Sequence, residues 1–347
     1  MPSATSTSRP SAPIVIGPTT KSATRPTVPL PSYLIEEGRL KEKVTFDAAS
    51  HLAFEPPANV VSMNDIGLDG QGISQTAVSD PFPLFTQSAI QQIRAEVFSE
   101  NVLKDCQFSS TFSRYMIRGM GPARAPFTYS AWNSPELVSY ISRVAGVDLI
   151  PSIDFEIATI NVSVDDSTET VAPRICENPE PLADGVSAVA WHYDSFPFVC
   201  VVMLSDCQGM VGGETALRTA SGDVMKVRGP AMGTAVVLQG RYIEHQALKA
   251  FGGKERISMV TCFRPRSPHL RDETVLTGVR GISDKSELYS QYLEYRLEMM
   301  EERIRLKMKE ERRRQVAALP FDVADVRNWL VEQREYIDSM IGEMIEE

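Results

Sequence analysis

Short apolar runs separated by glycine-rich turns fill the chain between residues 153 and 263, and this pattern constrains the fold most. Eight runs are expected as strands: 153–164, 186–193, 197–204, 214–218, 223–227, 234–239, 242–248 and 256–263. The glycines between them are Gly212, Gly213, Gly222, Gly229, Gly233, Gly240, Gly252 and Gly253. Short strands joined by tight turns are typical of sandwiches and barrels. We therefore predict an eight-stranded β core.

The second of these runs carries the residues with the clearest chemistry. His192 and Asp194 are two positions apart, so on a strand both side chains project from one face. His245 follows 51 residues after Asp194 and can supply a third ligand. Two imidazoles and a carboxylate on one side of a metal leave adjacent positions open, which suits non-haem Fe(II) and O2, although zinc sites use similar ligands. The other two histidines, His51 and His269, have no ligand spacing and are expected on the surface or in loops.

Arg256 and Ser258 belong to the same constellation, eleven and thirteen residues after His245. They share one face of the last predicted strand, which can look into the cavity that contains His245. A buried guanidinium is costly unless it meets an anion, and its planar fork pairs with a carboxylate through two hydrogen bonds. A 2-oxoacid that chelates the metal at one end and binds Arg256 at the other accounts for both halves of the motif.

Together these motifs resemble those of the Fe(II)/2-oxoglutarate-dependent oxygenases, which carry a His-x-Asp, a distal His and then an Arg-x-Ser. The resemblance covers residues 153–268, and the turns at 212–215 and 229–233 share it. It implies an α+β fold with a double-stranded β-helix core, that is, a cupin-like jelly roll. It also implies Fe(II), 2-oxoglutarate and O2 as cofactor and co-substrates, and oxidation of an unactivated C–H bond.

The substrate that the resemblance implies is a small molecule. The chain is similar to oxygenases of fungal secondary metabolism, including those that convert amino acids such as valine into aziridine carboxylates by cyclisation. Hydroxylation and desaturation are the other outcomes. The candidate substrate residues are Arg118, Arg124 and Arg264 for a carboxylate, with Asn161, Trp132 and Tyr193. For each of these residues the alternative is structural: a solvated charge, a satisfied core amide or a packing aromatic ring.

Three regions of different character are expected along the chain. Residues 1–31 contain seven prolines and no acidic residue; they are predicted to be a disordered tail, because proline opposes the helix of a mitochondrial presequence and no secretory apolar segment is present. Residues 32–268 form the oxygenase domain. In that domain, helices at 87–100 and after Ser134 buttress the core, and residues 112–132 form a strand and lid at the substrate side.

Residues 269–347 are predicted to be a helical extension. Asp284 suits the start of a helix at 287–314, Leu319-Pro320 interrupts it, and Asp322 can cap a second helix. Each helix carries an apolar stripe. Three roles remain open for the pair: packing on the amino-terminal helices, a lid over the barrel mouth, and the contact surface of a homodimer.

Composition limits the partners and the location. The net charge of -10 argues against nucleic acid, and no apolar run is long enough to cross a membrane. The five cysteines form no C-x-x-C pair, which indicates reduced thiols in the cytoplasm, with Cys200 and Cys262 buried in strands.

Two other classes of protein fit the same sequence. One is a cupin-like metalloenzyme that does not need 2-oxoglutarate, in which Arg256 would be a structural cation. The other is a protein hydroxylase or binding module whose carboxy-terminal helices bind a macromolecular partner. Turnover without 2-oxoglutarate would indicate the first class, and retention of a macromolecule without small-molecule oxidation would indicate the second.

Overall fold

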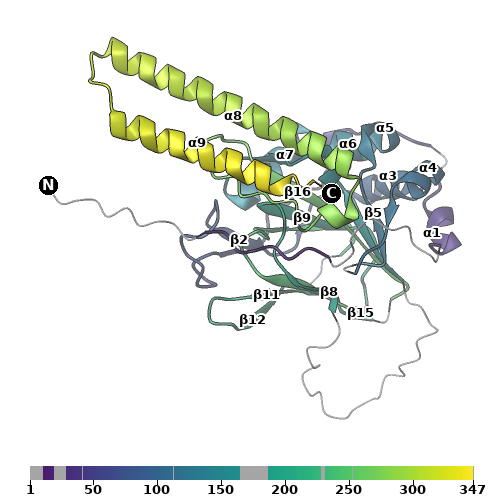
Figure 1. Cartoon of the computed structure of the whole chain (residues 1–347). Coiled ribbons are helices and arrows are strands. Elements are labelled where there is room, and N and C mark those ends of the chain that lie inside the picture. The colour runs from purple at the N-terminus through teal and green to yellow at the C-terminus, as the bar shows by residue number, and fades with distance from the viewer. Residues whose placement is uncertain are drawn as a thin grey trace.

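The computed structural model describes residues 11–18, 29–40, 42–111, 113–164, 187–227, 231–251 and 253–346. Two antiparallel β-sheets form its centre, with helices on the large sheet and a carboxy-terminal pair of long helices beside it (Figure 1). The structure is therefore a mixed α and β fold, as predicted. In the part of the chain that is described, no helix is both long and apolar enough to span a membrane.

The large sheet contains ten strands. Its main path runs β1 (Val60–Ser62), β2 (Thr76–Ser79), β13 (Thr234–Leu238), β9 (Phe198–Met203), β16 (Glu255–Pro265), β7 (Thr159–Val164), β5 (Tyr115–Ile117) and β4 (Gln107–Phe108). β3 (Phe82–Pro83) also pairs with β13, and β6 (Leu149–Pro151) pairs with β16. Every pairing in this sheet is antiparallel, and β16 is its longest strand.

The small sheet contains four strands, in the order β12 (Val224–Val227), β11 (Thr215–Arg218), β14 (His245–Leu248) and β8 (Ser187–His192). Beside it, β10 (Val211–Gly212) pairs with β15 (Ala250–Phe251). From β7 to β16 the chain passes repeatedly between the two sheets: β8, the β11–β12 hairpin and β14 belong to the small sheet, and β7, β9, β13 and β16 to the large one. Each of the eight predicted runs contains one of these strands.

Two predicted strands begin at the wrong place: the strand expected at 242–248 begins at His245, and the first begins well inside 153–164. Residues 154–156 form the short 3-10 helix η1 (Asp154–Glu156), and β7 begins at Thr159. Ala158 has a φ of 56°, in the left-handed region that a strand does not use. The apolar composition of residues 153–158 reflects burial beside the sheet, and the backbone there turns before it pairs.

Two hydrophobic cores lie on the two sides of the large sheet. Ile257, Met259 and Phe263 of β16 belong to the core under the amino-terminal helices. Cys262 belongs to the core between the two sheets, which also contains Leu217 of β11. This alternation follows from the two-residue repeat of a strand, and it places the face of β16 that carries Arg256 toward the small sheet.

The amino-terminal helices cover the outer face of the large sheet, as the predicted buttress. They are α1 (Ser32–Glu37), α2 (Ala48–His51), α3 (Gln87–Val97), α4 (Glu100–Asp105), α5 (Gly121–Arg124), α6 (Pro126–Trp132) and α7 (Pro135–Ala145). The predicted cap is confirmed, because the Ser134 hydroxyl accepts a hydrogen bond from the Leu137 amide at 3.3 Å. The expected strand and lid at residues 112–132 is only partly correct: β5 is present, but α5 and α6 follow it, and α6 packs into the core.

Two other expectations need correction. His51 is not a surface residue: it is buried, stacks on Phe46 and meets Phe127 edge-on. The expected disorder does not extend to residues 11–18, where Val15 is buried and the carbonyl of Pro13 accepts a hydrogen bond from Arg241. His269 is exposed, as predicted.

The cysteines agree with the prediction as far as they are described. Cys200 lies in β9 and Cys262 in β16, and both are buried. Cys106, Cys200, Cys207 and Cys262 form no disulfide with one another. Cys176 lies outside the described residues.

The carboxy-terminal extension follows the short helix η2 (Arg280–Ile282) and consists of α8 (Lys285–Val316) and α9 (Val323–Glu343). Both predicted caps are present: Asp284 accepts from the Glu287 amide and Asp322 from the Asp325 amide. Figure 1 shows the two helices side by side, with the turn between them far from the sheets. Only the start of α8 and the end of α9 pack on the core between the sheets, through residues that include Tyr292 and Met340.

Candidate metal centre and co-substrate pocket

The three predicted ligands meet at the edge of the small sheet. His192 and His245 are direct cross-strand partners on β8 and β14, with ring centroids 4.3 Å apart. Asp194 follows β8, and its amide donates to the carbonyl of Gly240 at 2.9 Å, which holds the chain against the turn before β14. One ligand atom from each of the three side chains lies within 4.8 Å of the others. The sequence prediction therefore places these side chains correctly.

Hydrogen bonds from the backbone orient both imidazoles. Nδ1 of His192 lies 2.7 Å from the carbonyl oxygen of Ala190, and Nδ1 of His245 lies 2.9 Å from that of Ile243. A carbonyl oxygen only accepts, so each Nδ1 carries the hydrogen and each Nε2 is left with its lone pair when the ring is neutral. Both Nε2 atoms lie 3.5 Å from a carboxylate oxygen of Asp194. This is the tautomer and orientation that metal-binding histidines use.

The electrostatics of Asp194 also fit a cation. Its Oδ2 atom is buried and accepts no hydrogen bond from the described residues. Burial alone would raise the pKa of this carboxyl, but the imidazoles of His245 and His192 outweigh it and hold the pKa below its usual range. Conversely, burial would lower the pKa of His245, and the Asp194 charge raises it. A buried carboxylate with an unused oxygen beside two Nε2 lone pairs suits a divalent metal ion.

Gly240 makes room for this arrangement. A Cβ atom at this position would lie 1.8 Å from Oδ2 of Asp194 and 3.1 Å from Cε1 of His245. Any side chain would therefore displace the carboxylate. The sequence marks Gly240 only as a turn residue, because the contact joins segments that are distant in the chain.

Arg256 and Ser258 lie on the face of β16 that looks toward the small sheet. The guanidinium Nη2 of Arg256 donates to the carbonyl of Gly213 at 3.2 Å, just before β11. Among the described residues Arg256 has no carboxylate partner, and burial lowers the pKa of its guanidinium. A mostly buried cation with unused donors fits the carboxylate of a ligand. Ser258, which is buried, adds a hydroxyl on the same face.

Asn161 is the one predicted substrate residue that the sheet brings directly beside this pair. It lies on β7 opposite Ser258 of β16, and direct cross-strand partners project from the same face. Asn161 is half-buried, and its side-chain amide forms no hydrogen bond with the described residues. Its amide is therefore available to a ligand between the two sheets.

A buried ion pair near Asp194 was not predicted as a unit. Arg118, which follows β5, pairs with Glu156 of η1, and the thiol of Cys262 lies 3.8 Å from Oε2 of the same carboxylate. Burial raises the pKa of Glu156, the Arg118 charge opposes that shift, and the charge of Asp194 adds to it. The sequence offers only two carboxylates, Asp154 and Glu156, that alternate with apolar residues in this segment. Arg118 is thus engaged within the protein, contrary to the role expected for it.

The remaining candidate substrate residues do not gather at the metal ligands. Trp132 is buried in the core under the helices, edge-on to Phe85 and Phe263. Arg124 is exposed on α5 and pairs with Asp105 at 3.2 Å. For both residues the expected substrate contact is wrong, because each packs on the helical side of the large sheet.

Arg264 and Tyr193 are also placed elsewhere. Arg264 lies eight residues beyond Arg256 on β16, donates to the Ser152 carbonyl and stacks over the ring of Tyr295. Eight residues of a strand span roughly 26 Å, so this side chain meets the carboxy-terminal helices. Tyr193 lies between His192 and Asp194 in the sequence, and the charges of Glu244 and Arg218 act on its phenol. Burial raises the pKa of its phenol.

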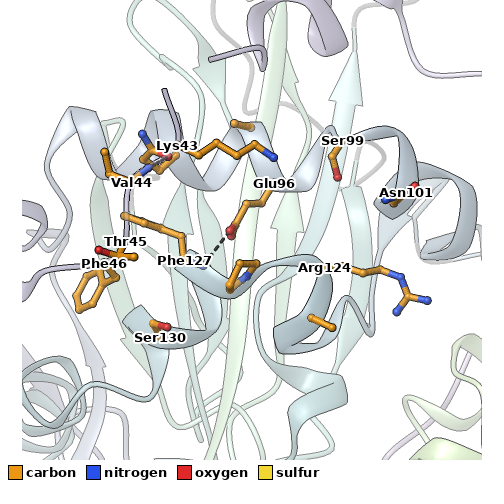
Figure 2. Close-up of a pocket in the computed structure, with 14 residues that line it drawn as sticks. Lys43, Val44, Thr45, Phe46, Glu96, Ser99, Asn101, Arg124, Phe127 and Ser130 are labelled. Atoms are coloured by element: carbon orange, nitrogen blue, oxygen red, sulfur yellow. Dashed lines mark hydrogen bonds between the residues drawn. The ribbon is translucent and has the colours of Figure 1, made fainter. Parts of the chain in front are cut away.

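A separate cavity of about 380 Å³ lies on the helical side. Figure 2 shows Lys43, Phe46, Glu96, Arg124 and Phe127 around it. The Glu96 carboxylate is fully used at the start of α6: it accepts from the Phe127 amide at 2.8 Å and from the amide and hydroxyl of Thr128 at 2.9 and 2.7 Å. None of the predicted metal ligands lines this cavity.

A second group of acidic side chains, Glu310, Glu311 and Asp325, lies on the distal part of α8 and α9. The ammonium group of Lys307 is paired with all three carboxylates. These three carboxylates are therefore held in an ion-pair network around one ammonium group.

Comparison with known proteins gives solved structures only. No protein-family model and no curated protein matches the chain. An oxidoreductase of the 2OG-Fe(II) oxygenase family from Burkholderia pseudomallei is similar at 13% identity, covering 46% of this chain and 70% of that one, with a TM-score of 0.32. A prolyl 4-hydroxylase from Phytophthora capsici is similar at 15% identity, covering 86% and 98%, with a TM-score of 0.40.

A third similar structure is HygX from Streptomyces hygroscopicus, with nickel, 2-oxoglutarate and hygromycin B bound. It is 15% identical, covers 56% of this chain and 84% of that one, and gives a TM-score of 0.35. At these identities and TM-scores none of the three assigns this chain a function. The functional proposal therefore rests on the site itself.

Proposed function

We propose that this protein is a non-haem Fe(II)/2-oxoglutarate-dependent dioxygenase that oxidises an unactivated C–H bond of a small molecule. The single observation that carries the proposal is the combination of a His192, Asp194 and His245 donor set with Arg256 on the facing sheet. Arg256 is mostly buried and forms no ion pair with the described residues, although the charge of Glu214 acts on it. A metal site alone would leave the reaction open. A buried guanidinium in this state supports a carboxylate co-substrate.

The strand order supports the same class. We interpret the repeated crossing between the two sheets, from β7 to β16, as a double-stranded β-helix, that is, a jelly roll. In this arrangement the small sheet supplies both histidines and the large sheet supplies Arg256 and Ser258. The co-substrate then lies between the sheets.

The residues have distinct tasks in this proposal. His192, Asp194 and His245 hold Fe(II), and the carbonyls of Ala190 and Ile243 fix the imidazoles in the binding tautomer. Arg256 and Ser258 hold the distal carboxylate of 2-oxoglutarate. When bound, Fe(II), 2-oxoglutarate and O2 supply the oxidising chemistry, in which the 2-oxoacid is converted to succinate and CO2.

The protein also limits access of water. Val201 and Val260 are apolar residues of the core between the sheets, on strands that neighbour each other in the large sheet. They line the same side of β9 and β16 as Ser258. An apolar wall beside the co-substrate strengthens its polar contacts and keeps water from the reacting centre.

The substrate in this proposal is an amino acid or a derivative of one. The three arginines suggested for a substrate carboxylate are engaged: Arg118 with Glu156, Arg124 with Asp105, and Arg264 with the Ser152 carbonyl. The proposal that the protein recognises an amino acid such as valine, and cyclises it to an aziridine in natural-product biosynthesis, therefore rests on the resemblance in sequence. A cytoplasmic location remains part of the same proposal.

Substrate-dependent release of succinate tests this function. The purified protein is incubated with Fe(II), O2, 2-oxoglutarate and each member of a panel of amino acids, and succinate is measured. Stimulation by one compound, lost in His245→Ala, supports the proposal. Oxidation of a small molecule at an unchanged rate without 2-oxoglutarate would instead indicate the cupin-like metalloenzyme.

A further inference from the structure

One broad face of the α8–α9 hairpin is apolar and uncovered. On α8 it consists of Leu293, Leu297, Ile304 and Met308, and on α9 of Val323, Leu330, Ile337 and Ile341. These side chains are between 37% and 64% exposed. Contiguous apolar surface of this extent usually marks a contact with another molecule. The hairpin stands clear of the sheets over its distal part, so the face is open to a partner (Figure 1).

The two apolar stripes lie on the same side of the hairpin. Around the axis of α8, with 3.6 residues per turn, the apolar stripe lies roughly a third of a turn away from the side chains that point into the protein, which are Arg296, Met299 and Arg303. The α9 stripe is turned by roughly a quarter of a turn, in the same sense, from Gln333 and Tyr336. In an antiparallel pair of helices, equal rotations bring both stripes to one side.

The hairpin does not use these apolar side chains to hold itself together. Its seam is largely polar: Arg296 donates to the Tyr336 carbonyl and the Ser339 hydroxyl, and Lys307 pairs with Asp325 across the helices. The apolar stripes therefore remain exposed to solvent in the folded hairpin. Burying them against another surface would remove apolar area from water, which favours association.

The charges beside the α8 stripe indicate what covers it. Along the outer edge of the stripe the charged residues are Glu294, Glu298 and Glu301 in the first half of the helix and Arg305, Lys309 and Arg312 in the second half. When a second α8 runs antiparallel to the first, the acidic half of each helix faces the basic half of the other. The face is thus complementary to itself, which is the requirement for a twofold interface.

We infer that two copies of this chain associate through this face, with the α8–α9 hairpins forming a four-helix bundle and the two sheet domains at opposite ends. Antiparallel packing of apolar stripes with charged edges is the geometry of such bundles. The twofold axis passes near Met300, midway between Leu293 and Met308. The hairpin is then a dimerisation element, and the core between the sheets does not need it as a lid.

Molar mass in solution tests the dimer directly. Light scattering coupled to size exclusion should show a dimer for the full chain at micromolar concentration. The double substitution Leu297→Glu and Ile304→Glu should give a folded monomer, as judged by circular dichroism. Val331→Glu is the matched control, because Val331 is also exposed but lies outside the stripe, and it should remain dimeric. A monomeric wild-type chain, or a dimeric double variant, would overturn the inference.

Charge reversal tests whether the charged edges of the two α8 helices face each other. One variant carries Arg305→Glu, Lys309→Glu and Arg312→Glu, and a second carries Glu294→Lys, Glu298→Lys and Glu301→Lys. Each alone should be monomeric, because like charges then face each other. An equimolar mixture should form a heterodimer that weakens at high salt. Failure of the mixture to associate, with each variant folded and the wild type dimeric, would exclude this geometry.

Discussion

Asp194 and His245 show how the ligands are prepared for a metal before it binds. The Asp194 charge raises the pKa of His245 against the effect of burial. The proton on His245 is therefore stabilised at mildly acidic pH in the metal-free protein, and this stabilisation is lost as the pH rises through the raised pKa. Since only the neutral imidazole binds a metal, the ion and the proton compete.

Metal affinity should consequently depend on pH. We expect the affinity for Fe(II), or for Co(II) as a probe, to rise by about tenfold per pH unit until His245 is neutral, and then to level off. Calorimetry in buffers of different ionisation enthalpy measures the proton released. An affinity that is constant between about pH 6 and about pH 8 would contradict the assignment of His245 as a ligand.

Gly240 allows a second prediction at this scale. Gly240→Ala places a methyl group on Oδ2 of Asp194, and we expect metal affinity to fall by about 10–100-fold, as when a ligand is misoriented. Equilibrium dialysis with Co(II) measures the loss. Gly342→Ala is the control, since a Cβ there meets nothing within 4 Å; equal affinity in both variants would show that the carboxylate can move without consequence.

Sequence spacing was sufficient to bring His192, Asp194 and His245 together and insufficient for the residues around them. Arg256 and Ser258 lie on one strand, and the two-residue period of a strand is readable in sequence. His192 ends β8 and Asp194 lies just beyond it, so the predicted spacing brought the two together although only one of them is on the strand. Arg118 is different, because its partner Glu156 lies 38 residues away in η1. No periodicity connects those two segments, and the burial of His51 against Phe127 was missed for the same reason.

At the scale of elements, the strands were predictable because most are short and rich in apolar residues, and glycines mark many of the turns between them. The helices were predictable where a cap marks the start, as Ser134, Asp284 and Asp322 do. The predictions were wrong in segments whose buried residues do not form a single type of secondary structure. Residues 153–158 and 121–132 are apolar because they pack beside the sheet, and their backbone conformation is decided by that packing.

The anchor of α8 is a further element whose strength can be tested. Arg296 and Asp272 are fully buried, with their charged atoms 3.2 Å apart, and Arg296 also donates to the Tyr336 carbonyl of α9. Asp272→Asn leaves the guanidinium without its counter-charge. We expect a loss of roughly 3–5 kcal/mol in the free energy of unfolding, measured by chemical denaturation.

The same pair predicts a pH dependence. Burial alone would raise the pKa of Asp272, but the Arg296 charge outweighs it and lowers the pKa in the folded state. The unfolded chain therefore binds more protons in acid, so stability falls as the pH drops below the ordinary aspartate range. The Asn variant should lose stability less steeply over that range. Parallel curves for the two proteins would show that Asp272 is not held ionised.

At the scale of the whole molecule, the two sheets and the hairpin have separate tasks. The small sheet carries His192 and His245 and the large sheet carries Arg256, and the hairpin supplies a surface for a second copy. Substitutions on the apolar face of α8 should therefore change molar mass without changing metal binding. Substitutions at the ligands should do the reverse.

An anaerobic titration of the protein with Fe(II) and 2-oxoglutarate, followed by visible absorbance, tests the central claim most directly. A metal-to-ligand charge-transfer band should appear, and Arg256→Ala should require about tenfold or more 2-oxoglutarate to develop it, since a charged hydrogen-bond pair is lost. Arg218→Ala, a control on the exposed side of β11, should titrate like the wild type. Absence of the band in the wild type, or unchanged affinity in Arg256→Ala, would contradict the account.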